Sequence, residues 1–265
     1  MEIGEELWEG FWHDDVSVEQ EVAWRVHETD VMPVIERHMP RQGELLDAGC
    51  GRGGMLIYLF RRGYPMRGCD LSQRNLDLIK AYEPDVPLDR EDILDFSYAD
   101  ARFDAMFSYG VMEHFEDGPA RALAEAHRIL KPGGLIFVSV PYTAWLREIV
   151  ASGRDSPRAR RIFGKPPRPP AGAPAIPELA FRRADFASEV IGAGFHIVEA
   201  VPIFGRHHAA HMLPAFRSRA YPDEIDYGTI LSPPLSRLGQ AVYRVAHRLA
   251  PWSMAHFQFV VARRL

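Results

Sequence analysis

Three alternating glycines follow an acidic residue in the segment LLDAGCGRGG, residues 45–54. An apolar run ends at Asp47, and Gly49, Gly51 and Gly53 come next, directly before a helical pattern. A glycine-rich turn between a strand and a helix lets a ligand approach the backbone closely and offers N–H groups to an anionic group. We therefore expect a cofactor-binding loop at this position.

Two kinds of cofactor fit this loop. Gly49, Gly51 and Gly54 satisfy the G-x-G-x-x-G pattern of dinucleotide-binding proteins. Asp70 also lies near the distance at which an acid would bind a ribose. Asp47 separates the alternatives, because its carboxylate would attract an ammonium group but repel a pyrophosphate. A ligand with a carboxylate, an ammonium and a ribose fits better, and a nicotinamide dinucleotide stays the alternative.

The surrounding pattern predicts the elements that position this loop. Short apolar segments alternate with helical segments, which is typical of βαβ units and a parallel sheet. Strands are expected at 44–48, 66–70, 86–91, 103–108, 135–140, 195–201 and 257–262, and helices at 53–62, 72–82, 118–130, 183–193 and 235–249. The prediction is a doubly wound α/β fold with a Rossmann-like sheet of about seven strands, mostly parallel with an antiparallel last strand.

Three segments lie outside the predicted sheet and its own helices. Residues 1–40 hold one or two helices, with Pro33 interrupting the helical spacing, and are expected to form an N-terminal helical cap. Residues 142–185 are rich in proline, so an irregular lid is expected there. Residues 202–254 form a helical insertion. The cap therefore precedes a sheet domain, residues 41–265, that carries both insertions.

The sequence resembles the class I S-adenosylmethionine-dependent methyltransferases, in particular the small-molecule branch that includes ubiquinone and menaquinone biosynthesis enzymes. The resemblance is strong over residues 41–141 and weak over 178–201. It rests on five segments in the order of the family: LLDAGCGRGG at 45–54, CDLS at 69–72, EDILDF at 91–96, FDAMFSYGVMEHF at 103–115 and RILKPGGLIFVSVP at 128–141.

The resemblance implies S-adenosylmethionine as the cofactor and S-adenosylhomocysteine as its product. It places Asp70 at both ribose hydroxyls, Asp92 at the adenine amine and Ile93 near the ring. Acids at the ends of neighbouring parallel strands lie at the same edge of a sheet, so these acids can line one binding site. The expected cofactor-binding set is Asp47, Gly49, Gly51, Gly53, Asp70, Leu71, Asp92, Ile93 and Tyr109.

A histidine is the first candidate for a general base. Methyl transfer from a sulfonium is an in-line displacement, so the protein must mainly align the acceptor, and a base is optional. His114 follows the fourth strand, where donor and acceptor meet in the family, and histidine titrates near neutral pH. Packing under the helix, or contact with the cofactor alone, is the alternative role. The second-choice catalytic candidates are His207, His208 and His211.

No metal is expected at these histidines. Some quinone-pathway relatives place a glutamate three residues before a Glu-His pair and bind a metal with all three side chains. Here Gly110 takes that position before Glu113 and His114. The RHHAAH cluster at 206–211 has no acidic or cysteine third ligand near it in the sequence.

Composition and charge limit the partners. With 31 Lys and Arg against 36 Asp and Glu, the net charge of -5 makes nucleic acid a disfavoured partner. A basic run at 154–168 suits an anionic or carrier-linked acceptor or a membrane surface, and the arginine-bearing stripe 235–249 suits a membrane surface. A solvated loop is favoured for the run, and packing against the core or a second subunit is favoured for the stripe.

We therefore expect a cytoplasmic methyltransferase that uses S-adenosylmethionine and acts on a small molecule. The N-terminus lacks the features of a secretory signal, and no apolar run is long enough to span a membrane. Oxygen is favoured over nitrogen or carbon as the acceptor atom. The alternatives are an NAD-linked oxidoreductase that uses the same loop and a module that binds the cofactor without turnover. An RNA methyltransferase would need a basic face that the composition barely allows.

Overall fold

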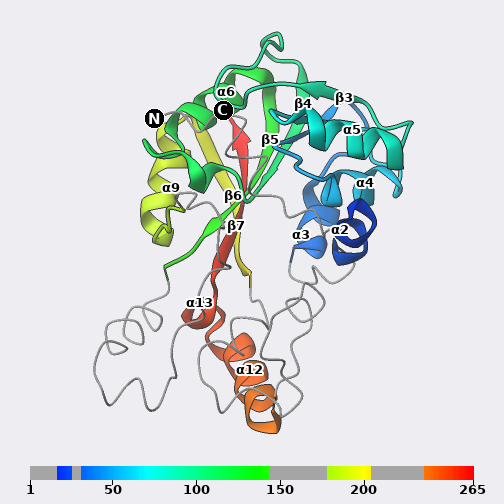
Figure 1. Cartoon of the computed structure of the whole chain (residues 1–265). Helices are drawn as coiled ribbons and strands as arrows, with labels where there is room; N and C mark the ends of the chain where they lie inside the picture. Colours follow the sequence, from blue (N-terminus) through cyan, green and yellow to red (C-terminus); the bar gives the residue numbers. More distant parts are fainter. Residues whose placement is uncertain (1–16, 26–30, 144–177, 204–235) are drawn as a thin grey trace. The chain divides into compact units, whose positions relative to one another are not determined.

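The computed structural model describes residues 17–25, 31–143, 178–203 and 236–265 (Figure 1). The chain divides into two compact units. Unit 1 comprises Met1–Pro141, Ala173–Val201 and Phe259–Leu265, and unit 2 comprises Tyr142–Gly172 and Pro202–Gln258. Most of the predicted lid and its basic run, residues 144–177, lie outside the described residues.

Seven strands form one sheet in the order β3-β2-β1-β4-β5-β7-β6. They are β1 (Leu45–Ala48), β2 (Met66–Asp70), β3 (Leu88–Arg90), β4 (Phe103–Tyr109), β5 (Leu130–Pro141), β6 (Phe195–Ile203) and β7 (Phe257–Arg264). Neighbours from β3 to β5 pair in parallel, whereas β7 runs against β5 (Figure 1). The predicted Rossmann-like fold, with its antiparallel last strand, is confirmed.

The strand β1 lies at the point where the strand order reverses. Leu45 pairs with Met66 of β2 on one side and with Ala105 of β4 on the other. All four residues of β1 are buried, as expected for a parallel strand that is covered on both faces. The carboxyl ends of β1, β2 and β4 therefore meet at the switch point, where ligands of open α/β sheets bind.

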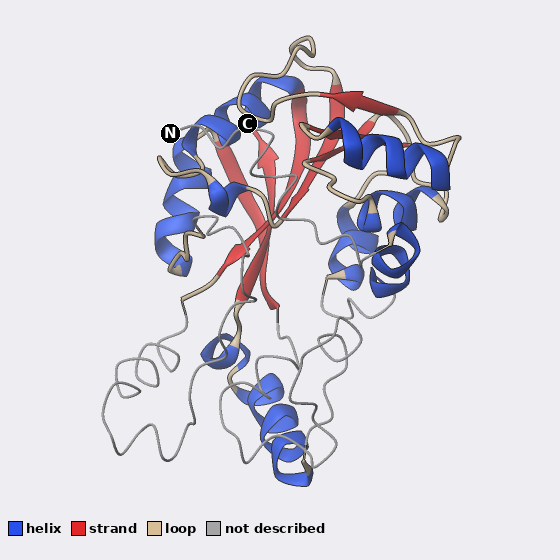
Figure 2. Ribbon diagram, in the orientation of Figure 1, coloured by secondary structure: helices blue, strands red, loops and turns tan. Residues whose placement is uncertain are grey.

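Helices cover both faces of the sheet (Figure 2). The helices α6 (Ala120–Ile129) and α9 (Arg183–Gly192) lie on one face. The other face carries α2 (Val18–Arg25), α3 (Met32–His38), α4 (Gly54–Phe60) and α5 (Gln73–Tyr82). Among the described residues two helices precede β1, and Pro33 does not interrupt either of them. It lies in the first turn of α3, where a missing backbone N–H costs no hydrogen bond.

Side-chain chemistry explains where α5 begins and which face of α6 is buried. The hydroxyl of Ser72 accepts the N–H of Asn75 and caps α5. In α6 the buried residues Leu123, Ala126 and Ile129 recur at helical spacing and pack in one core with Phe186 of α9.

The N-terminal helix α2 packs over α4, which follows the glycine loop. As a result, residues 54–59 of α4 are all buried, rather than one stripe alone. Both helices belong to unit 1, so the N-terminal segment forms part of the wall around the loop.

The described part of unit 2 contains α12 (Arg237–Leu249) and α13 (Pro251–Met254). The predicted helix at 235–249 is thereby confirmed, two residues shorter at its start. Next to it, Trp252 meets the ring of Tyr142 edge to face, with centroids 5.3 Å apart. Among the helices that the structure describes, none has the length and apolar character needed to cross a bilayer.

Candidate functional site

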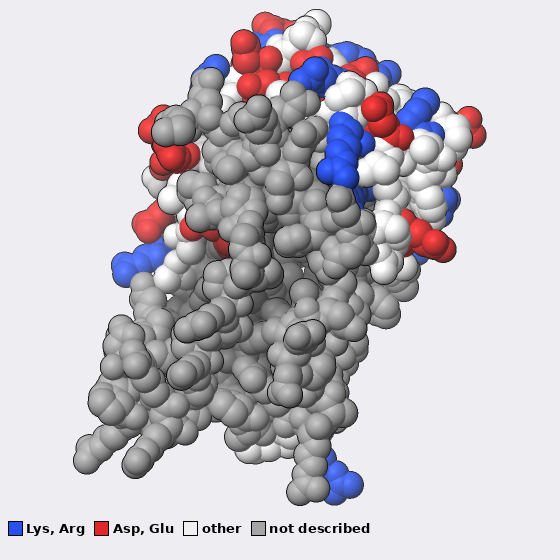
Figure 3. Space-filling view, viewed as in Figure 1, with Lys and Arg blue, Asp and Glu red and all other residues white. Residues whose placement is uncertain are grey.

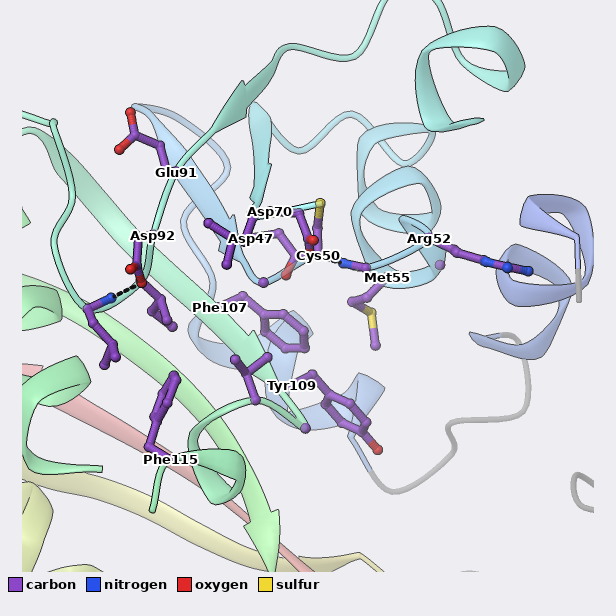
Figure 4. Close-up of a pocket in the computed structure, with 18 of the residues that line it drawn as sticks. Asp47, Cys50, Arg52, Met55, Asp70, Glu91, Asp92, Phe107, Tyr109 and Phe115 are labelled. Atoms are coloured by element: carbon purple, nitrogen blue, oxygen red, sulfur yellow. Dashed lines mark hydrogen bonds between the residues drawn. The ribbon is translucent and has the colours of Figure 1, made fainter. Parts of the chain in front are cut away.

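A cavity of about 280 Å³ lies at the carboxyl ends of β1, β2 and β4 (Figure 4). Most of the expected cofactor-binding residues line it: Asp47, Gly49, Gly51, Asp70, Leu71, Asp92, Ile93 and Tyr109. Gly53 does not line the cavity but precedes the first turn of α4. His114 does not line it either, and His207, His208 and His211 lie outside the described residues.

The glycine loop bonds to its own chain rather than presenting its amides. The N–H groups of Gly49 and Cys50 both donate to the carbonyl of Cys69 at 2.9 Å, and the N–H of Gly53 donates to the carbonyl of Cys50 at 2.8 Å. The N–H of Gly51 donates to Asp70 Oδ2 at 2.8 Å. The expectation that this loop offers its N–H groups to an anion is therefore wrong for these four residues.

Gly49 shows why this loop requires glycine. Its φ of +72° is a left-handed conformation, which residues with a side chain rarely adopt. A Cβ atom at this position would lie 2.7 Å from Cγ2 of Val111. Because both residues line the cavity, a side chain at Gly49 would fill the space in which the loop and the β4 turn approach each other.

Asp70 ends β2 and faces the cavity (Figure 4). Its Oδ1 accepts the N–H of Ser72 at 2.9 Å, in addition to the Gly51 bond. Burial raises the pKa of this carboxyl above its ordinary value, and the backbone N–H donors oppose that shift. Asp70 is thus a fixed acceptor whose orientation is set by the loop.

Two further carboxylates line the same cavity. Asp47 is only 3% exposed and lies beside Asp70 in Figure 4. Asp92 follows β3, and its Oδ1 accepts the N–H of Leu94 at 2.8 Å, which holds the side chain in a tight turn. The cavity is therefore lined by carboxylates that lie at, or directly after, the carboxyl ends of three neighbouring strands.

Apolar and aromatic groups form the rest of the wall. Ile93 and Leu94 line the cavity near Asp92, as does Phe115. The rings of Phe107 and Tyr109 on β4 stack with centroids 5.9 Å apart. A flat heteroaromatic ring fits between such side chains, and polar groups at its edge can reach the acids.

Several lining residues were not predicted from the sequence. They are Glu21, Cys50, Arg52, Met55, Glu91, Leu94, Phe107, Val111, Phe115, Glu116, Asp117 and Arg121, together with neighbouring glycines. Glu21 comes from α2, and Arg52 extends from the loop toward the N-terminal helices (Figure 4). Some of these residues carried a usable signal because they lie inside the quoted motifs: Arg52 in the glycine motif, Leu94 in EDILDF and Phe107 in FDAMFSYGVMEHF.

Glu113 and His114 lie in the 3₁₀ turn η1 (Met112–His114), directly after the β4 end of the cavity. Both are buried, with exposures of 1% and 7%. Burial raises the pKa of Glu113 to about 8, and the charge of Glu178 adds to the shift. Its Oε2 atom is buried without a hydrogen-bond partner within the described ranges. A buried acid of this kind is mostly protonated at neutral pH.

The cysteines of the site are thiols. Cys50 lines the cavity and Cys69 lies under the loop, and neither forms a disulfide. Burial and the nearby Asp70 and Asp47 charges raise the pKa of Cys50 well above its ordinary value. Across residues 17–25, 31–143, 178–203 and 236–265, no group of three or more His, Cys, Asp or Glu is arranged to hold a metal ion.

Charged residues of both signs are interspersed on the described surface in the view of Figure 3. Some of them form a network at the end of the sheet where β1 and β2 begin. There Arg67 and Arg102 both contact the carboxylate of Glu44, at 3.2 Å and 2.6 Å. These ion pairs lie away from the cavity and contribute to the fold rather than to the site.

Comparison with curated proteins gives matches over the part of the chain that builds this cavity. Residues 46–138 match a family model described as a methyltransferase domain. The chain is 29% identical over 142 residues to a probable S-adenosylmethionine-dependent methyltransferase of Mycolicibacterium smegmatis, which covers 52% of this chain and 51% of the relative. It is 28% identical over 173 residues to the 27-O-demethylrifamycin SV methyltransferase of Amycolatopsis mediterranei. That match covers 60% of this chain and 59% of the relative. The chain thus spans little more than half the length of these curated relatives.

Solved structures share the fold over most of the chain. A S-adenosylmethionine-dependent methyltransferase from Methanosarcina mazei superposes with a TM-score of 0.59 at 16% identity, covering 89% of this chain and 99% of that one. The 1,6-didemethyltoxoflavin-N1-methyltransferase of Burkholderia thailandensis, solved with its substrate and S-adenosylhomocysteine, has a TM-score of 0.52 at 18% identity, covering 93% and 80%. At these identities the likeness shows the fold.

Proposed function

We propose that this chain, which carries an S-adenosylmethionine-dependent methyltransferase domain over residues 46–138, transfers the methyl group of that cofactor to a small or carrier-linked molecule. Oxygen is the favoured acceptor atom, and the name of the rifamycin relative also specifies an O-methyl position. One observation carries the proposal: acidic side chains line the cavity at the strand ends, while the N–H groups of residues 49–51 and 53 are bonded within the chain.

The residues around the cavity fit this cofactor. The carboxylate of Asp47 suits the ammonium of the methionine part, and that of Asp70 accepts the two ribose hydroxyls. Asp92 accepts the adenine amine, and Ile93 packs near the ring. A pyrophosphate would meet two acids and a loop whose amides are already used, so a nicotinamide dinucleotide fits less well.

The cofactor, when bound, supplies a methyl group on a sulfonium with a neutral thioether as the leaving group. The protein must hold the acceptor in line with that methyl and exclude water. We assign the acceptor side to the turn after β4 and to α2. Within the described residues, Tyr109 and Glu21 reach the cavity from this side.

We propose His114 as the residue that accepts a proton from a hydroxyl acceptor. His114 is the last residue of the η1 turn, and the next residue, Phe115, lines the cavity. His114→Ala should lower kcat at least tenfold while the affinity for S-adenosylhomocysteine stays the same. His196→Ala, on an exposed position of β6, is the matched control and should retain full turnover. Full turnover of His114→Ala would assign the proton to solvent or to another group.

Calorimetric titration tests the cofactor assignment directly. S-adenosylhomocysteine and NAD⁺ are titrated separately into the full chain, and we expect heat of binding with the first and none with the second. Binding of NAD⁺ alone would overturn the proposal and support the oxidoreductase alternative.

Turnover is tested with S-adenosylmethionine and a panel of hydroxylated, amine and carrier-linked acceptors. The expected result is a product heavier by one methylene, found by mass spectrometry. Cofactor binding without any product over the panel would instead support a module that binds the cofactor and does not catalyse.

A further inference from the structure

The helix α12 of unit 2 exposes an apolar stripe. Leu238, Val242, Val245 and Leu249 recur at the spacing that places side chains on one face of a helix. Leu238 is 55% exposed, Val245 is 57% exposed and Leu249 is 76% exposed. The sequence alone favoured packing of this stripe against the core or a second subunit, but in the structure these three side chains face solvent.

A different side of α12 makes the contacts within the unit. Gly239 is buried and Tyr243, one turn further, is half-buried. These two positions lie about 100° or more around the helix from the middle of the apolar stripe, at 100° per residue. Three of the four stripe residues therefore stay exposed and Val242 is half-buried, although burying such side chains would be favourable.

Three arginines border the stripe on its other flank. Arg237, Arg244 and Arg248 follow the same helical spacing as the stripe, and all three are exposed. No Asp or Glu occurs anywhere in residues 236–258. The helix thus combines an uncovered apolar face, a row of positive charges along its length and no compensating acid.

We propose that α12 docks on an anionic lipid surface, with the stripe among the acyl chains and the arginines at the headgroups. Helices of this pattern lie in the plane of the interface, and long arginine side chains can reach the phosphates while their stems stay in the apolar layer. A second copy of the chain with α12 paired antiparallel fits less well, because that pairing would bring the two arginine rows together. The lipid phosphates match the charge of the row instead.

The experiment measures binding of the full chain to vesicles by co-sedimentation. One set is phosphatidylcholine alone, and the other is phosphatidylcholine with phosphatidylglycerol. We expect strong binding to the anionic vesicles only, and release when salt is raised from about 0.1 M to 1 M, which shortens the screening length from about 10 Å to 3 Å.

Two double variants separate the charge from the apolar contribution. Arg244→Gln with Arg248→Gln should weaken binding to the anionic vesicles by roughly 25-fold, since each basic residue at such a surface contributes about fivefold. Val245→Ser with Leu249→Ser should weaken it at least about tenfold.

Matched controls make the same changes elsewhere on the surface. Arg74→Gln with Arg183→Gln alters two exposed arginines, and Leu78→Ser with Ile191→Ser alters two exposed apolar residues. Both controls should bind vesicles like the unaltered chain. The far-ultraviolet circular dichroism and the affinity for S-adenosylhomocysteine should match in all variants, which shows that each chain is folded.

Three results would overturn the proposal. The first is equal binding to neutral and anionic vesicles, or no binding to either. The second is a loss of binding in the control variants as large as in the α12 variants. The third is self-association of the unaltered chain in sedimentation velocity that the α12 serine variants abolish, because the stripe would then be a subunit interface.

Discussion

The carboxylate of Asp70, at the end of β2, accepts the backbone N–H of Gly51 from the loop after β1 at 2.8 Å. One side chain therefore joins two neighbouring strand ends at the switch point of the sheet. The same carboxylate faces the cavity, so the group proposed to bind the ribose is also the group that orients the glycine loop.

Asp70→Asn should lower the affinity for S-adenosylhomocysteine by at least about tenfold, because hydrogen bonds to a charged acceptor are worth about 1.5–3 kcal/mol. The melting temperature should change little, since burial of the charge already opposes the gain from the N–H donors. Calorimetric titration and thermal unfolding measure the two effects. Asp77→Asn, on the exposed side of α5, is the control and should leave both unchanged.

Gly49→Ala should lower the free energy of unfolding by about 2–5 kcal/mol. The left-handed backbone contributes about 1–2 kcal/mol and the contact with Val111 about 1–3 kcal/mol. Chemical denaturation of the variant measures the sum, and cofactor affinity should fall with it because both residues line the cavity.

Two comparison variants separate these contributions. Gly63→Ala has a similar φ of +79° and no atom within 4 Å of the new Cβ, so it reports the backbone effect alone. Adding Val111→Ala to Gly49→Ala should recover part of the loss, because the methyl carbons at 2.7 Å and 3.0 Å are removed. A double variant as unstable as Gly49→Ala would show that the contact with Val111 does not matter.

Glu113 makes stability depend on pH in the direction opposite to a paired carboxylate. Its folded pKa of about 8 lies above the value of 4.5 for an unperturbed glutamate, so the folded state keeps a proton that the unfolded state releases. The free energy of unfolding should therefore fall as pH rises from about 4.5 to 8.

Glu113→Gln should remove this dependence. The variant should be more stable than the unaltered chain at pH 8.5 and should lose that advantage at pH 4.5, as followed by thermal unfolding across the range. Glu178→Gln, on an exposed residue, should give only a small change in the same direction, because its charge is a minor cause of the shift. Parallel curves for Glu113→Gln and the unaltered chain would contradict the assignment.

Arg128→Lys should destabilise residues 96–100, the segment that follows the cavity-lining residues 91–94. The guanidinium donates to the carbonyls of Phe96 and Tyr98 and to the carboxylates of Glu125 and Asp100, all at 2.7–2.9 Å. An ammonium cannot reproduce this planar fork, so we expect a loss of about 2 kcal/mol in denaturant unfolding. Arg263→Lys, whose side chain donates to the carbonyl of Gly133 at an exposed site, should cost much less.

The fold was predictable because its signals are local. Apolar runs and helical spacing placed the strands and helices from residue 44 to 140, and the order of the glycine loop and the acids placed the edge of the sheet that binds ligands. The strand β5 begins earlier than predicted, at Leu130, because Phe103 pairs with Leu130 across a register irregularity beside β4. Pro132 and Gly133 are residue types that are disfavoured inside strands, so the local sequence gave no sign of this pairing.

The rest of the site depends on contacts between distant parts of the chain. Glu21 reaches the cavity only because α2 packs over α4, and Arg121 does so from the first turn of α6. Glu113 was part of a familiar pair in the sequence, but its burial and unpaired oxygen follow from the packing of residues 178–181 over the η1 turn, where the N–H of Leu179 donates to its carbonyl. No local pattern encodes such packing.

The carbonyl of Cys69 and the carboxylate of Asp70 accept N–H groups of the glycine loop, so the chain itself holds the loop in shape. Ligand recognition is left to the side chains that project around the loop, and those that make no hydrogen bond to it can be exchanged without rebuilding it. An engineer who wished to retarget the cavity to a cofactor analogue with an altered base would therefore vary Asp92, Ile93 and Leu94 and leave residues 49–53 untouched. Asp70 would also stay, because exchanging it would release the N–H of Gly51 as well as change the cavity wall.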